Sequence, residues 1–90
     1  MKKVRIYRGN GTGAAPIVAR GRTLESAILN GGRVMGEIGC GAYDKIGLMT
    51  HYTGGGTYHV QFGRYLPKLH STTLSVLYVV QDISSKQKGD

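Results

Sequence analysis

The sequence predicts an α+β fold, in which an antiparallel sheet of four or five strands carries one helix on one face in the order β-β-α-β-β-β. Several short segments alternate apolar and polar residues, as half-buried strands do, and one segment repeats apolar residues at helical spacing. The segment from His51 to His59 reads the same in both directions around Gly55. That pattern is typical of a long β-hairpin with a glycine tip.

Residues 2–8 and 17–22 are predicted to be the first two strands, because apolar and basic side chains alternate along both. Residues 9–16 between them form a glycine-rich loop. The apolar sides of both strands face the helix. The other sides carry basic residues and one tyrosine, namely Lys3, Arg5, Tyr7, Arg20 and Arg22.

Thr23 is placed to cap the helix, since apolar residues recur at helical spacing directly after it. Gly31 and Gly32 together cost a continuing helix about 2 kcal/mol relative to alanine. We therefore favour a helix that ends at Asn30, with residues 33–38 extended, over the alternative in which the helix continues to Gly36.

The hairpin takes Gly54, Gly55 and Gly56 as its loop, and folding about Gly55 places His51 opposite His59. A slip by one residue would mix apolar with polar side chains, so the pattern itself selects this register. The register gives one apolar face, made by Ile46, Leu48, Tyr52, Tyr58, Val60 and Phe62.

Residues 66–70 are predicted to be a connection broken by Pro67. Residues 72–83 form the last strand, which is apolar on both faces and therefore belongs in the middle of the sheet. Residues 1–83 make one domain, and residues 84–90 are a polar tail that we expect to be disordered.

The chain has no apolar stretch long enough to span a bilayer, and its first residues are charged where a signal peptide needs an apolar run. We expect a cytoplasmic protein without a membrane partner. The single Cys40 cannot form an internal disulfide.

Positive charge is concentrated at the front of the chain. Residues 1–35 hold seven of the twelve Lys and Arg residues and one acid, Glu25, and so carry +6 of the total +7. Such clustering favours a polyanionic partner, either nucleic acid (RNA or DNA) or an acidic protein surface. The composition also allows a homodimer.

We expect the basic strands and the hairpin to bind the partner, with Tyr7 as a candidate for base stacking. The candidate binding residues are Lys3, Arg5, Tyr7, Arg8, Arg20, Arg22, His51, Gly54, Gly55, Gly56 and His59. The glycines of residues 9–13 lack the following helix that a dinucleotide-binding loop requires, and no cofactor is predicted.

The predicted histidine pair is too small for a metal site, because a structural zinc ion needs four ligands and a catalytic one usually takes three from the protein. No metal is predicted. His51 and His59 beside arginine have the residue types of a metal-independent ribonuclease, which we keep as a lesser alternative to a protein without enzymatic activity.

The sequence therefore predicts a small non-enzymatic binding protein that engages nucleic acid or a nucleoprotein through a basic face and a projecting hairpin. The alternative is an inhibitor that acts through protein interaction. In size and layout the chain is similar to accessory proteins of phages and mobile elements, including anti-CRISPR and other anti-defence inhibitors. This resemblance covers organisation only, and it implies an acidic or nucleic-acid-binding protein as the partner.

Overall fold

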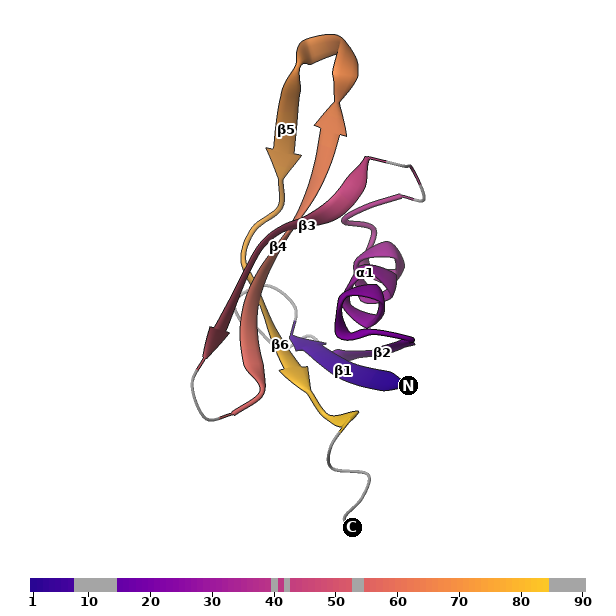
Figure 1. Ribbon diagram of the computed structural model, residues 1–90, viewed down its shortest axis with the longest axis vertical. Helices are drawn as coiled ribbons and strands as arrows, with labels where there is room; N and C mark the ends of the chain where they lie inside the picture. Colours follow the sequence, from indigo (N-terminus) through magenta and orange to yellow (C-terminus); the bar gives the residue numbers. More distant parts are fainter. Residues whose placement is uncertain (8–14, 40, 42, 53–54, 85–90) are drawn as a thin grey trace.

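The computed structural model describes residues 1–7, 15–39, 41, 43–52 and 55–84, and within them it contains one antiparallel sheet and one α-helix (Figure 1). The elements are β1 (Lys2–Tyr7), β2 (Ile17–Gly21), α1 (Leu24–Met35), β3 (Asp44–Tyr52), β4 (Thr57–Leu66), the 3₁₀ helix η1 (Pro67–Leu69), β5 (Ser71–Leu74) and β6 (Tyr78–Asp82). The strands lie in the order β2-β1-β6-β4-β3, and β5 pairs with the outer part of β4. The α+β class and the predicted order of elements are confirmed.

Strands β1 and β2 pair as their alternation predicts. Val4 lies opposite Ala19 and Ile6 lies opposite Ile17. Val4, Ile6 and Ala19 are buried on the side that α1 covers, whereas Ile17 is only half-buried. Alternation then turns Lys3 and Arg5 of β1 and Arg20 of β2 away from the helix.

The helix begins as predicted but ends later. Thr23 Oγ1 accepts a hydrogen bond from the Ser26 amide at 3.1 Å, and Ser26 Oγ accepts one from the Thr23 amide at 2.9 Å, which completes a capping box. The favoured end at Asn30 is wrong, and the alternative of a helix that continues past Gly31 and Gly32 is the one that forms. The helix runs on to Met35 and is capped by Gly36 in a left-handed conformation with φ of 80°.

Gly31 and Gly32 remain helical because they let α1 lie close to the sheet. A Cβ atom at Gly31 would collide with Ile6 Cδ1, and one at Gly32 would lie 2.7 Å from Phe62 Cε1. Both partners are fully buried. Packing of α1 on the sheet therefore outweighs the low helix propensity of the two glycines.

The long hairpin between β3 and β4 forms with a register that differs from the predicted one. The last pair near its tip is Tyr52 with Thr57. His51 lies opposite Tyr58 instead of His59, so the predicted pair of facing histidines is wrong.

The register also shifts within the hairpin, at a β-bulge at Gly47. Ile46 lies opposite Phe62 while Leu48 lies opposite Gln61, which leaves Gly47 as an extra residue on β3. Beyond the bulge every β3 side chain points to the face opposite to the predicted one. Leu48, expected in the core, is 44% exposed.

Residues 72–83, predicted as one strand, form two. Strand β5 ends at the pair of Leu74 with Gly63, and β6 then pairs with β1 and β4. Between the two strands, Ser75 forms two hydrogen bonds with the backbone of Phe62. The Ser75 amide donates to the Phe62 carbonyl at 2.8 Å, and Ser75 Oγ accepts from the Phe62 amide at 2.9 Å. The central position of β6 is as predicted.

A second hairpin, built from β4, η1 and β5, extends the molecule at one end (Figure 1). We call residues 64–74 the arm. At its turn His70 adopts a left-handed conformation with φ of 50°, and its amide donates to the Pro67 carbonyl at 3.2 Å. Leu69 beside it is 69% exposed.

The core lies between α1 and one face of the sheet (Figure 1). Its buried members are Val4, Ile6, Ala19, Ala27, Ile28, Ile38, Val60, Phe62, Tyr78 and Val80. The other face of the sheet is left without a covering layer in the described residues. In that part of the chain no helix has the length and apolar character needed to cross a membrane.

Candidate functional site

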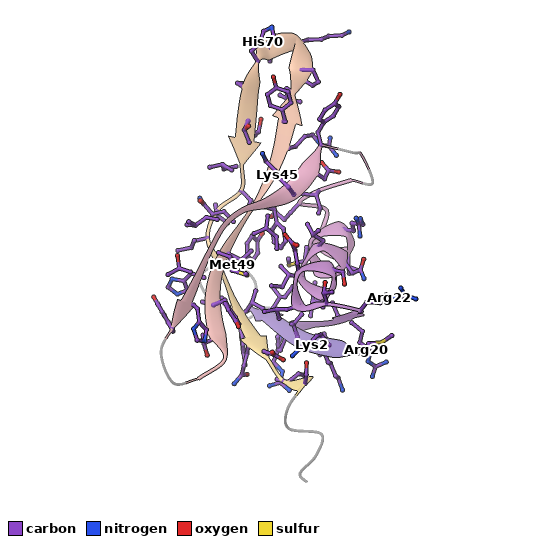
Figure 2. The ribbon with its side chains drawn as sticks, in the orientation of Figure 1. Lys2, Arg20, Arg22, Lys45, Met49 and His70 are labelled. Atoms are coloured by element: carbon purple, nitrogen blue, oxygen red, sulfur yellow. The ribbon has the colours of Figure 1, made fainter. Side chains whose placement is uncertain are left out.

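The face of the sheet that points away from α1, here called the open face, gathers most of the predicted binding residues of the strands. Strand alternation and the pairing registers assign it Val18 and Arg20 of β2, Lys3, Arg5 and Tyr7 of β1, Val79 and Gln81 of β6, Thr57, His59 and Gln61 of β4, and Lys45, Leu48, Thr50 and Tyr52 of β3. Its basic residues lie mainly at the β1 and β2 end, where Figure 2 labels Arg20.

Two cations lie directly opposite each other at this end. Lys3 of β1 pairs with Arg20 of β2, and both side chains belong to the open face. Like charges in directly opposed positions destabilise a sheet. The opposed pair therefore concentrates positive charge on this part of the open face.

Gln81 positions two of the candidate residues. Its Oε1 accepts hydrogen bonds from Arg5 Nη1 and from the Tyr7 hydroxyl, each at 3.4 Å. Arg5 and Gln81 are cross-strand neighbours, and Tyr7 is 38% exposed. The amide thus holds a guanidinium and a phenol ring side by side on the surface.

Tyr52 and His59 form a second polar aromatic pair on the open face. Their ring centroids lie 4.4 Å apart, and the tyrosine hydroxyl is hydrogen-bonded to His59 Nδ1 at 2.9 Å. Tyr52 is 44% exposed. Together with Tyr7, the pair offers ring surfaces on β1, β4 and β3.

The carboxylates of the described residues lie elsewhere. Asp82 is opposite Val4 on the helix side and is 3.8 Å from Lys2 Nζ. Glu25 lies in the first turn of α1, and Glu37 accepts a hydrogen bond from the buried Tyr78 hydroxyl. The open face therefore carries cations without a described carboxylate to neutralise them.

The fourth carboxylate, that of Asp44, forms an ion pair with Arg64 at the start of the arm. Arg64 Nε donates to Asp44 Oδ1 at 2.8 Å, and the Gly41 amide donates to Oδ2 at 3.0 Å. The hydrogen bond from Arg64, assisted by that amide, holds the pKa of Asp44 below its ordinary value. Asp44 shares its face of the sheet with Phe62 and so faces away from the open face.

Several predicted site residues are not on the open face. His51 lies on the other side of the hairpin, with its ring 4.8 Å from that of Tyr58. Arg22 follows β2 and points away from the body (Figure 2). The ribonuclease hypothesis required His51 and His59 on one face, and the register removes that arrangement.

Gly56, the last of the three glycines between β3 and β4, is hydrogen-bonded to β6. Gly56, with φ of 61°, accepts a hydrogen bond at its carbonyl from the Asp82 amide at 2.8 Å. Gly55 beside it is exposed. Arg8 and Gly54 lie outside the described residues, so their predicted roles remain predictions.

Sequence reasoning missed Lys45, Tyr52 and Gln81. Lys45 and Tyr52 lie on either side of the Gly47 bulge. Strict alternation would place them on opposite faces of the sheet, and the bulge brings both onto the open face. Gln81 was hidden in an apolar segment, where its neighbours Val79 and Val80 suggested burial on both faces. A single glycine at the start of a predicted strand was the available signal for the bulge.

No protein-family model, curated protein or solved structure matches this chain. Among the described residues, no three His, Cys, Asp or Glu side chains gather in a way that could hold a metal ion.

Proposed function

We propose that the open face binds single-stranded nucleic acid. The observation that carries this proposal is the cross-strand pair of Lys3 and Arg20, which lies on a face with exposed aromatic rings and no described carboxylate. When phosphates bind, they neutralise these cations and remove the repulsion between them. Relief of this repulsion stabilises the complex relative to the free protein.

A single strand fits this surface better than a duplex does. The rings of Tyr7 and Tyr52 are 38% and 44% exposed on a broad sheet, and unpaired bases can stack on rings presented in this way. The bases of a duplex are already stacked on one another, so a duplex would use only the cations. Binding is therefore expected to combine phosphate contacts with base stacking.

The experiment measures the affinity for fluorescently labelled oligouridine and oligothymidine by anisotropy at several salt concentrations. If Lys3, Arg5 and Arg20 each contact a phosphate, the slope of log affinity against log salt is expected to be about −2. Lys3→Glu should reduce the magnitude of the slope by about 0.7, and Tyr52→Ala should weaken binding by roughly 5- to 150-fold at constant salt.

Lys68→Glu in η1 is the matched control, because it changes the net charge equally on the arm, away from the open face. Equal weakening by Lys3→Glu and Lys68→Glu would show that only overall charge matters. Absence of binding to both oligonucleotides would refute the proposal. Tighter binding of one of them would assign RNA or DNA as the ligand.

The second candidate function is contact with another protein through the arm. Leu69 is 69% exposed at the turn, next to the left-handed His70. Leu66, Pro67 and Leu69 line one hollow of the arm, and contiguous exposed apolar surface is typical of protein-interaction sites. Leu69→Ser should leave oligonucleotide affinity unchanged, and a loss of affinity in that variant would place the arm in the nucleic-acid site.

A further inference from the structure

The sheet has two outer strands along its main path, β2 and β3, and they differ in how their free edges are protected. The β2 edge is short and partly covered, because Asn30 Nδ2 of α1 donates to the Arg20 carbonyl at 2.7 Å. The β3 edge is nine residues long. No described side chain forms a hydrogen bond with the β3 backbone between Lys45 and Tyr52.

The β3 edge also lacks the side chains that usually prevent edge pairing. From Ile46 to Tyr52 it contains no Lys, Arg, Asp, Glu or Pro. Leu48 and Met49 are 44% and 42% exposed. The bulge at Gly47 lies toward one end of the strand and leaves a regular segment, Leu48 to Tyr52, with an open row of backbone groups.

We infer that β3 pairs with β3 of a second copy of this chain, in antiparallel orientation about a two-fold axis near Met49. A two-fold arrangement brings the same uncharged segment of both copies together. Hydrogen bonds along the edge and burial of Leu48 and Met49 stabilise the pair.

For pairing between two copies, the charge distribution favours the β3 edge over the β2 edge. The chain carries +7, and the basic residues Arg20 and Arg22 lie on the opposite side of the molecule from Met49 (Figure 2). Pairing through β3 keeps the two basic ends far apart, where salt screens their repulsion. Pairing through β2 would place the arginines of both copies side by side.

The test is sedimentation equilibrium of the free protein over a wide range of concentrations. The apparent mass is expected to rise from one chain toward two chains as the concentration increases. Met49→Lys should keep the mass at one chain throughout, because it places two cations next to the two-fold axis.

Val18→Lys on β2 is the matched control. Val18 is 49% exposed and the substitution adds the same charge, so this variant is expected to dimerise like the parent protein. Far-UV circular dichroism of both variants checks that each is folded. A parent protein that stays monomeric at all concentrations, or equal loss of dimer in both variants, overturns the inference.

A cross-linking experiment locates the contact independently of the stability of the Met49→Lys variant. In a Cys40→Ser background, Met49→Cys should give a covalent dimer with a short bismaleimide, and Val18→Cys should not. A covalent dimer from Val18→Cys alone would move the interface to β2 and would overturn the inference.

Discussion

Replacing Gly32 with alanine tests whether close packing against the sheet governs the middle of α1. Alanine gains about 1 kcal/mol over glycine in a helix. The new Cβ would lie 2.7 Å from Cε1 and 2.9 Å from Cδ1 of Phe62, whose side chain is 1% exposed and cannot move toward solvent. Overpacking of a core costs about 1–3 kcal/mol, and contacts this short belong at the upper end. We expect a net loss of about 1–2 kcal/mol in the free energy of unfolding.

Urea unfolding followed by circular dichroism measures this loss, and the melting temperature should fall by roughly 4–16 °C. In a Phe62→Leu background the same Gly32→Ala change should be neutral or stabilising by up to about 1 kcal/mol, because the smaller side chain makes room for the methyl group. Val34→Ala, at a position that is 71% exposed on α1, is the control for helix propensity. An increase in stability on Gly32→Ala alone would refute the reasoning.

Substitutions at three further positions test local features by thermal unfolding. Arg64 lowers the pKa of Asp44 in the folded state below the ordinary value of 3.8, so their interaction stabilises the fold at neutral pH and is lost as the pH falls through that lowered pKa. Asp44→Asn should therefore melt below the parent protein near neutral pH, with a difference that narrows below about pH 4; a constant difference would contradict this. Thr23→Ala should lower stability by about 1 kcal/mol through loss of the helix cap, and an unchanged melting temperature would speak against the cap. Ser75→Ala should cost about 1–3 kcal/mol because it leaves the Phe62 amide without its side-chain acceptor, whereas Ser75→Thr, which keeps the hydroxyl, should recover most of the loss.

The basic end of the candidate site could be predicted from the sequence. Lys3, Arg5 and Arg20 alternate with apolar residues in their own strands, and period-two alternation assigns a side chain to a face without knowledge of distant partners. Tyr52 and Gln81 could not be assigned in this way. The face of the sheet on which Tyr52 lies depends on a bulge. Gln81 bonds to Arg5 and Tyr7, which are both more than 70 residues away in the chain.

Local chemistry in the sequence determined the class of fold, the start of α1 at Thr23 and the orientation of β1 and β2, because caps and alternation act between residues close in the chain. Contacts between distant residues decided the rest. Gly31 and Gly32 stay helical because of Ile6 and Phe62, Leu74 lies over the bulged Gly47, and Ser75 ends β5 by bonding to Phe62. In each case a packing or hydrogen-bonding gain from across the sheet exceeds the local preference, and that gain exists only once the strands have come together.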